Sequence, residues 1–280
     1  MAFFNKHQWW IVFVVGASCM FSIFVFVLIL TRDDEAADSA TGGGSHYVRL
    51  SQGNKGVIIF VHGVLGDGTS TWTNPNTKAY WPDLLTQDRT FDNYNIYVYE
   101  FPSSLLEKSD TIDELTSDMM FRLEDAGVLG HEELIFLSHS MGGLVTRGLL
   151  VKHHELIEKT GFIYFFSTPT TGSELAPISA LLSTNPQFHN MFPMGEEVNS
   201  YIEFVQSAWL DLPKKPLSFC AYEILDTNGI KTVTRQSTTN LCTEKLAPIP
   251  ANHISIVKPA NKTSLSYIVF KAAFVKAHKY

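Results

Sequence analysis

The chain has 280 residues, of which 45% are hydrophobic and 18% are charged, so it can bury a large core and is not expected to be disordered as a whole. Its formal net charge is -7, and no cluster of basic residues stands out. These features exclude nucleic acid as an expected partner.

The first element is an uncharged apolar run of 22 residues from Trp9 to Leu30. As a helix this run would be about 33 Å long, enough to cross a hydrocarbon core of about 30 Å. The apolar part of a cleavable signal peptide is shorter, at about 7–15 residues. We therefore expect residues 1–8 to form a short tail and residues 9–30 to form a single-pass transmembrane anchor.

The charges around this run indicate its orientation. Lys6 and the terminal amine precede it, whereas Arg32 follows it and leads into acidic residues. By the positive-inside rule we expect a cytoplasmic N-terminus, with the rest of the chain on the outer, periplasmic or lumenal side. Residues 31–45 are polar, then acidic, then rich in glycine, which predicts a flexible linker before a domain at 46–280.

Within 46–280, short apolar runs alternate with segments of helical spacing. The runs are rich in β-branched and aromatic residues and mostly lack polar alternation, which is typical of strands buried on both faces. They predict strands at 57–62, 95–101, 134–138, 161–167 and 217–223. Helices are predicted at 111–126, 141–154 and 261–278. This order predicts an α/β fold, with a mostly parallel central sheet and helices on both faces.

The segment 172–215 interrupts this order after a predicted strand. It contains several prolines and two apolar stretches. A lid over a site at the sheet edge is one interpretation, and a pair of ordinary surface helices is the other.

Three cysteines are present. Cys19 lies in the predicted anchor, whereas Cys220 and Cys242 flank a loop. In an oxidising compartment the latter two could form a disulfide, and two buried thiols are an equal alternative. Without CxxC, HExxH or a His/Cys cluster, no metal site is expected.

The segment SHSMGG, at 138–143, joins a predicted strand to a predicted helix. It resembles the G-x-S-x-G nucleophile elbow, in which a sharp turn exposes the serine at the end of a sheet. Gly142 occupies the last position of that pattern, and Ser138 replaces its first glycine. Ser140 is therefore the candidate nucleophile, at the positive end of a helix dipole.

A serine needs a base and an orienting carboxylate, which follow it in the order acid, then histidine, in such folds. Of the ten histidines, His253 lies after the last predicted strand and just before the last helix, where the base belongs. His139, inside the elbow, is expected to point away from the hydroxyl. For the acid, Glu223 at a strand end is preferred to Asp226, and Asp211 is a weaker third candidate.

The oxyanion formed on attack needs two backbone N–H donors. We expect one from Met141, which follows the nucleophile, and one from Val64, in the loop after the strand 57–62. This loop contains several glycines, but it lacks the Gly-Lys-Ser/Thr of a phosphate-binding P-loop.

These motifs together resemble the α/β-hydrolase superfamily. VHGVLGD, SHSMGGLV, STPTTGS and ANHISIVKP occur in the order of that superfamily, over nearly all of residues 57–275. They are most similar to the branch containing the serine active site-containing protein, the GPI inositol-deacylase and lipase-like relatives. The Tyr-Glu that ends a strand resembles the acid position of this branch, which supports Glu223. Thr170 stands where lipases often have a histidine, so the likeness to triacylglycerol lipases is looser.

The sequence thus predicts a membrane-anchored serine hydrolase that cleaves carboxylic esters, with a lipid or lipid-linked ester as the candidate substrate. No metal or organic cofactor is implied. An acyltransferase, thioesterase or amidase would use the same three residues. A non-catalytic hydrolase-like domain that binds a partner at the membrane is the alternative from another class. Oligomeric state is not indicated.

Overall fold

A computed structural model describes residues 44–63, 66–101, 112–170, 196–229, 241–244 and 246–279 of the chain. The predicted tail, anchor and nearly all of the predicted linker lie outside these residues. Within the ranges described, no helix has both the length and the apolar character needed to cross a bilayer.

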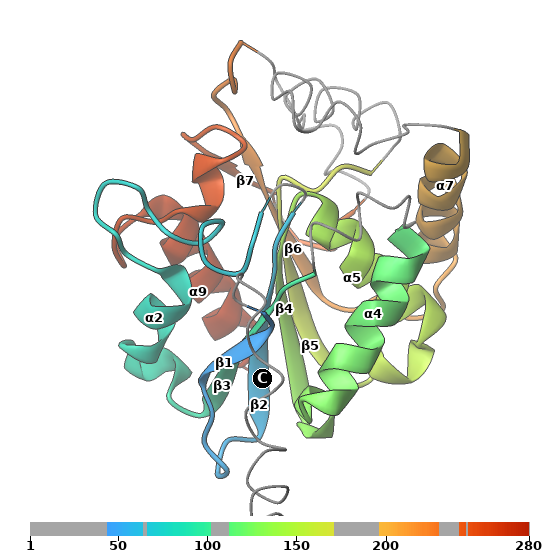
Figure 1. Cartoon of the computed structure of the whole chain (residues 1–280), viewed down its shortest axis with the longest axis horizontal. Coiled ribbons are helices and arrows are strands. Elements are labelled where there is room, and N and C mark those ends of the chain that lie inside the picture. The colour runs from blue at the N-terminus through green and yellow to red at the C-terminus, as the bar shows by residue number, and fades with distance from the viewer. Residues whose placement is uncertain are drawn as a thin grey trace, which may run out of the picture. The chain divides into compact units, whose positions relative to one another are not determined.

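Among the described residues, seven strands form one sheet in the order β1-β3-β2-β4-β5-β6-β7 (Figure 1). Only the pairing of β1 with β3 is antiparallel, and the other five pairings are parallel. The prediction of a mostly parallel sheet is therefore confirmed. The strands are β1 His46–Arg49, β2 Gly56–Val61, β3 Tyr94–Tyr99, β4 Glu133–His139, β5 Thr160–Phe166, β6 Ser218–Glu223 and β7 Leu246–Ile249.

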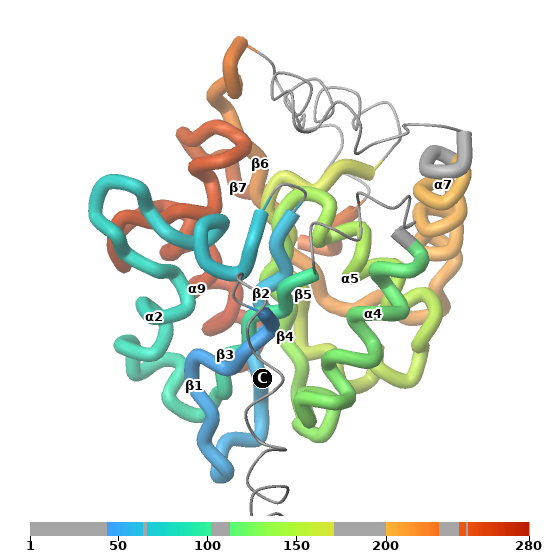
Figure 2. Tube along the Cα trace, in the orientation of Figure 1, coloured from blue at the N-terminus to red at the C-terminus, as the bar shows by residue number. Residues whose placement is uncertain are grey.

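Helices cover both faces of this sheet, as Figures 1 and 2 show. Helices α2 and α9 lie over one face, and α4, α5 and α7 lie over the other. Their bounds are α2 Trp81–Thr86, α4 Ile112–Asp125, α5 Met141–Lys152, α7 Glu196–Leu210 and α9 Leu265–Ala277. The sheet is thus enclosed on its two faces, and its strand ends are left to carry a site.

The strand residues divide alternately between two cores. In β2, Val57, Ile59 and Val61 pack on the side of α4 and α5, whereas Ile58 and Phe60 pack on the side of α2 and α9. Both sets are wholly buried. Because each face meets helices, few positions are left for a polar residue, and this explains why the runs mostly lack alternation.

Among the described strands and α-helices, the sequence missed three, all of them short. Strands β1 and β7 have four residues each, and both are only partly buried. Their patterns are too short to show a period of two. Helix α2 has six residues with a proline in its first turn, which gives too little chain for helical spacing to be visible.

Helix α7 is the described part of the segment 172–215 that the sequence interprets as a lid or as surface helices. It contacts α5, and its side chains Ile202, Val205 and Trp209 are buried. The buried guanidinium of Arg147 on α5 lies 5.5 Å from the centre of the Trp209 ring. Residues 171–195 lie outside the described residues, so the lid stays a prediction.

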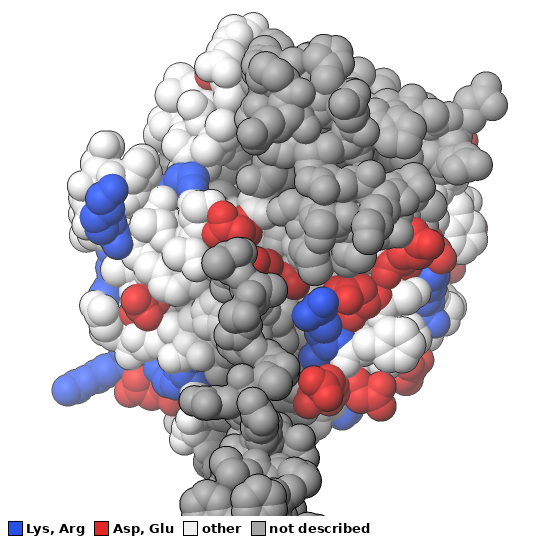
Figure 3. Space-filling model, in the orientation of Figure 1, with Lys and Arg blue, Asp and Glu red and all other residues white. Residues whose placement is uncertain are grey.

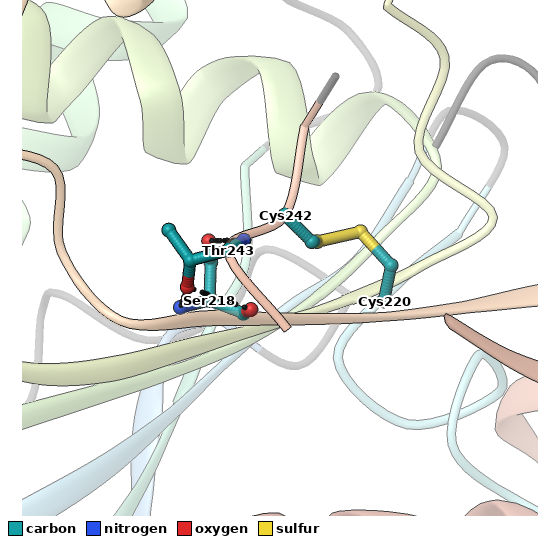
Figure 4. The surroundings of a disulfide bond; sticks show 4 residues. All are labelled: Ser218, Cys220, Cys242 and Thr243. Atoms are coloured by element: carbon teal, nitrogen blue, oxygen red, sulfur yellow. Dashed lines mark hydrogen bonds between the residues drawn. A yellow bond between two sulfur atoms is a disulfide. The ribbon is translucent and has the colours of Figure 1, made fainter. Parts of the chain in front are cut away.

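Cys220 and Cys242 form a disulfide, which selects one of the two alternatives left open by the sequence. Cys220 lies in β6, and Cys242 lies in the connection that leads to β7 (Figure 4). Beside it, Ser218 and Thr243 exchange hydrogen bonds of 3.0 and 3.1 Å. The strand that carries Glu223 is therefore tied to the connection in two places.

Charged side chains of both signs alternate over the face drawn in Figure 3, and acidic ones gather over α4. In α4, Arg122 forms an ion pair with Asp118 at 2.8 Å, one turn away.

Candidate active site

Ser140 stands at the corner where β4 ends and α5 begins. Its backbone has φ 52° and ψ -126°, a conformation that non-glycine residues rarely adopt. Holding serine there costs on the order of 1–3 kcal/mol, and such strain is tolerated where surrounding structure enforces it. The Ser140 amide donates to the carbonyl of Phe166 in the neighbouring strand at 2.9 Å, which fixes the corner.

Gly142 is required by the close approach of β2 to this corner. A Cβ atom at Gly142 would lie 2.3 Å from the carbonyl oxygen of His62 and 2.5 Å from that of Val61. Backbone atoms of a central strand cannot move aside at low cost. The glycine therefore lets the first turn of α5 pack against the end of β2.

Ser138, which replaces the first glycine of the elbow pattern, is wholly buried. Its hydroxyl lies 2.9 Å from the hydroxyl of Thr146, which itself donates to the carbonyl of Gly142 at 2.8 Å. The departure from the pattern is thus accommodated by a hydrogen bond between strand and helix.

The side chains of Ser140, His253 and Glu223 come from separate parts of the chain and form a line of contacts. The Nε2 atom of His253 lies 2.9 Å from Ser140 Oγ, and its Nδ1 atom lies 3.3 Å from Glu223 Oε1. All three residues are nearly or fully buried. The arrangement has the geometry in which a base can take the serine proton while a carboxylate orients the ring.

Glu223 is the last residue of β6 and is wholly buried. Burial raises the pKa of its carboxyl, but hydrogen bonds from His253 and Ser167 outweigh burial, and the net shift is downward. The Ser167 hydroxyl donates to Oε2, the oxygen that does not face His253. Glu223 is therefore ionised at neutral pH and is held at both of its oxygens.

The other two acids considered from the sequence lie elsewhere. Asp226 and Asp211 are both exposed. Neither forms a hydrogen bond or ion pair with His253, whose carboxylate partner is Glu223. The backbone turns outward after Glu223, and this direction removes Asp226 from the buried site.

His139 points away from the Ser140 hydroxyl, toward the loop that carries the base. Its Nε2 atom lies 2.9 Å from the carbonyl oxygen of His253, and the two rings are 5.0 Å apart. Burial, followed by the nearby His253, lowers the pKa of His139 well below its ordinary value. The ring is thus neutral and carries its proton on Nε2.

The loop after β2 begins beside the nucleophile. A Cβ atom at Gly63 would lie 2.8 Å from Ser140 Cβ. Val64, expected to supply one oxyanion donor, lies outside the described residues. Met141, expected to supply the other, is the first residue of α5, where backbone N–H groups have no acceptor within the helix.

His62 supports this loop. Its Nε2 atom accepts a hydrogen bond from the Phe101 amide at 3.2 Å, and its ring stacks on that of Phe101 at 4.0 Å. Burial lowers its pKa to about 4. His62 is thus a neutral structural residue at neutral pH.

Sequence reasoning missed the roles of two residues at this edge of the sheet. Ser167 follows β5 directly, with φ 46°, and Thr227 accepts a hydrogen bond from the His253 amide at 2.9 Å. The signal available for Ser167 was a polar residue directly after a buried strand. Phe166 in β5 pairs with Ala221 in β6, so the residue that follows β5 lies near the end of β6. No local pattern marks Thr227.

No protein-family model matches the chain. Among curated proteins it is similar to Protein SERAC1 of Bos taurus, with 26% identity over 259 residues, and to Protein SERAC1 of Mus musculus, with 25% over 260. In both cases the match covers 78% of this chain and 38% of the relative. The chain therefore matches well under half the length of these relatives.

Solved structures resemble the chain more completely. The lipase BlEst2 of Bacillus licheniformis aligns with a TM-score of 0.56 and 14% identity, over 84% of this chain and 99% of that one. YbtT, a type II thioesterase, aligns with a TM-score of 0.55 and 12% identity, over 84% and 99%. An α/β hydrolase from a lagoon-sediment metagenome, MGS-MChE2, aligns with a TM-score of 0.53. The chain has the α/β-hydrolase fold.

Proposed function

We propose that this protein is a membrane-anchored serine hydrolase that cleaves carboxylic esters through an acyl-enzyme on Ser140. The observation that carries the proposal is the buried sequence of contacts from Ser140 through His253 to Glu223, with separations of 2.9 and 3.3 Å. The fold supports it, because its solved relatives include a lipase and a thioesterase.

In the proposed reaction, Ser140 Oγ attacks the carbonyl carbon while His253 Nε2 takes its proton. Ionised Glu223 accepts the Nδ1 hydrogen bond and stabilises the imidazolium. The oxyanion is bound by the backbone N–H groups of Met141 and Val64, at the positive end of α5. His253 then returns the proton to the leaving alcohol. Water, deprotonated by His253, releases the acid from Ser140.

A membrane location for this activity rests on the apolar run at 9–30. With an anchor there, the linker 31–45 would keep the domain near a bilayer, which makes a lipid or lipid-linked ester the proposed substrate. The proposed orientation puts the domain on the outer, periplasmic or lumenal side. The disulfide between Cys220 and Cys242 supports this side, because such bonds persist in oxidising compartments.

A fluorophosphonate probe tests the nucleophile. The full chain in detergent is expected to react with the probe, and Ser140→Ala is expected to abolish labelling. Ser138→Ala is a matched control, because it removes a buried hydroxyl of the same elbow that faces Thr146 and not the base. Labelling that persists in Ser140→Ala would refute the assignment.

The substrate class is tested with a panel of p-nitrophenyl esters, thioesters and amides of increasing acyl length. Esters are expected to give the highest kcat/KM, and His253→Ala to remove turnover. A preference for thioesters or amides would leave the three catalytic residues as assigned and change the proposed reaction class. Transfer of the acyl group to an added alcohol would indicate an acyltransferase. A chain that neither reacts with the probe nor turns over any substrate would be a non-catalytic binding domain.

A further inference from the structure

The candidate base is held by its backbone as well as by its ring. The His253 amide donates to Thr227 Oγ1 at 2.9 Å, and the His253 carbonyl accepts from His139 Nε2 at 2.9 Å. Both partners are side chains, and all three residues are buried. The backbone N–H and C=O groups of this one residue are thus satisfied from two separate parts of the fold.

We propose that His139 and Thr227 are positioning residues that clamp the backbone of His253 and so hold its ring on Ser140. The proposal rests on the proposed function, since it assigns a role in that reaction. Neither residue touches the reacting atoms, so each acts through His253. We call the two hydrogen bonds the backbone clamp.

The need for a clamp follows from where His253 lies. It is in a turn between β7 and α9, and so it lacks the ladder of hydrogen bonds that fixes residues in a strand. The imidazole is joined to the backbone by two rotatable bonds, so a backbone shift carries Nε2 with it. Proton transfer requires Nε2 to stay within about 2.6–3.2 Å of the serine oxygen.

His139 is suited to this role because it immediately precedes the nucleophile. The last residue of β4 binds the base while the next residue forms the elbow, so the positions of Ser140 and His253 are set by adjacent peptides. The site packs closely here: a Cβ atom at Gly63 would lie 3.3 Å from His139 Nδ1 and 2.8 Å from Ser140 Cβ.

The electrostatics of His139 fit the same role. His253 becomes positively charged in the reaction, and its ring is 5.0 Å from that of His139. Burial keeps the pKa of His139 far below its ordinary value, so the residue donates its hydrogen bond without adding a second positive charge. A permanently charged donor such as lysine would oppose formation of the imidazolium.

Turnover of p-nitrophenyl butyrate by the full chain tests the clamp. His139→Leu and Thr227→Val each remove one hydrogen bond and are expected to lower kcat about tenfold, with KM within about twofold of the parent. His139→Gln keeps an N–H donor at a similar reach and is expected to recover most of kcat. Because both bonds hold the backbone of one residue, the double variant is expected to lose much less than the product of the single losses.

Two variants far from the site serve as controls. His131 contacts the Val128 carbonyl and the Asn95 side-chain amide, each at 2.9 Å, and Thr86 donates to the Asp83 carbonyl at 2.8 Å. His131→Leu and Thr86→Val therefore remove side-chain hydrogen bonds that do not involve His253 and are expected to leave kcat unchanged. Equal losses of kcat in these controls, or a fully multiplicative double variant, would overturn the clamp.

Hydrogen–deuterium exchange tests the clamp without any turnover. In a Ser140→Ala background, His139→Leu and Thr227→Val are expected to accelerate exchange in the peptide that contains His253, with unchanged exchange in the central strands. Unchanged exchange at His253 would overturn the clamp. If the parent chain cleaves no substrate but exchange responds, the proposed function fails and the clamp as a structural device stands.

Discussion

Ser167→Ala is the change that most directly tests how the site holds its carboxylate. The Ser167 hydroxyl donates to Oε2 of Glu223, inside a site where Glu223 is wholly buried. The opposite oxygen faces His253 Nδ1 at 3.3 Å, a separation beyond the usual range for a strong hydrogen bond. Loss of the Ser167 donor therefore removes one of the hydrogen bonds that orient this carboxylate toward His253.

The magnitude follows from the charge of the acceptor. A hydrogen bond to a charged group contributes about 1.5–3 kcal/mol, and each 1.4 kcal/mol corresponds to a factor of about ten. If this hydrogen bond serves to keep Glu223 oriented toward His253 in the transition state, its loss lowers kcat/KM for p-nitrophenyl butyrate roughly 10- to 100-fold.

The pH profile of Ser167→Ala has a defined direction. The pKa of Glu223 is depressed below its ordinary 4.5, because hydrogen bonds from His253 and Ser167 outweigh burial. This depression stabilises the fold above pH 4.5, and the contribution is lost as pH falls through the folded pKa. Without the Ser167 donor the pKa of Glu223 rises, so Ser167→Ala loses stability at neutral pH and its acid unfolding moves to higher pH.

Ser167→Gly separates catalysis from backbone strain. Ser167 has φ 46°, which glycine adopts freely. Both variants lack the hydroxyl and are expected to share one catalytic defect, while Ser167→Gly is of order 1 kcal/mol more stable in urea unfolding. Wild-type kcat/KM with an unshifted acid unfolding profile in Ser167→Ala would refute the orienting role.

Three further predictions concern stability. Gly142→Ala puts a Cβ atom 2.3 Å from the backbone carbonyl oxygen of His62, directly after β2. We expect the free energy of unfolding in urea to fall by about 2–3 kcal/mol, and the fluorophosphonate probe not to label the variant. A variant that is as stable as the parent and still reacts would contradict this. Reduction of the bond between Cys220 and Cys242, 22 residues apart, is expected to cost about 3 kcal/mol and to lower Tm by roughly 6–12 °C; an unchanged Tm in dithiothreitol would contradict it. His278 lies 3.1 Å from Glu133, and its pKa is raised from 6.5 mainly by that hydrogen bond, while the pKa of Glu133 is lowered from 4.5. The pair therefore stabilises the fold most between about pH 4.5 and 6.5 and loses this effect as pH rises through the folded pKa of His278. His278→Gln is expected to cost about 1 kcal/mol more near pH 5.5 than near pH 9, and an equal cost at both values would refute the ion pair.

The sequence by itself determined the features that depend on neighbouring residues. Apolar runs without polar alternation predicted the five longer strands, because a strand enclosed on both faces admits few polar residues. The elbow was visible as a serine between a strand and a helix with Gly142 after it, because only glycine fits where β2 passes so close. The position of His253 followed from the order of elements along the chain.

Only the tertiary structure decided which distant groups meet. Glu223 and Asp226 are three residues apart in one segment, and only the direction of the backbone after β6 brings Glu223, and not Asp226, to His253. The pairing of Cys220 with Cys242 and the contact of His139 with the His253 carbonyl were decided in the same way. The physical reason is that spacing along a chain reports local periodicity, whereas Ser140 and His253, 113 residues apart, come within 2.9 Å through the packing of the whole sheet.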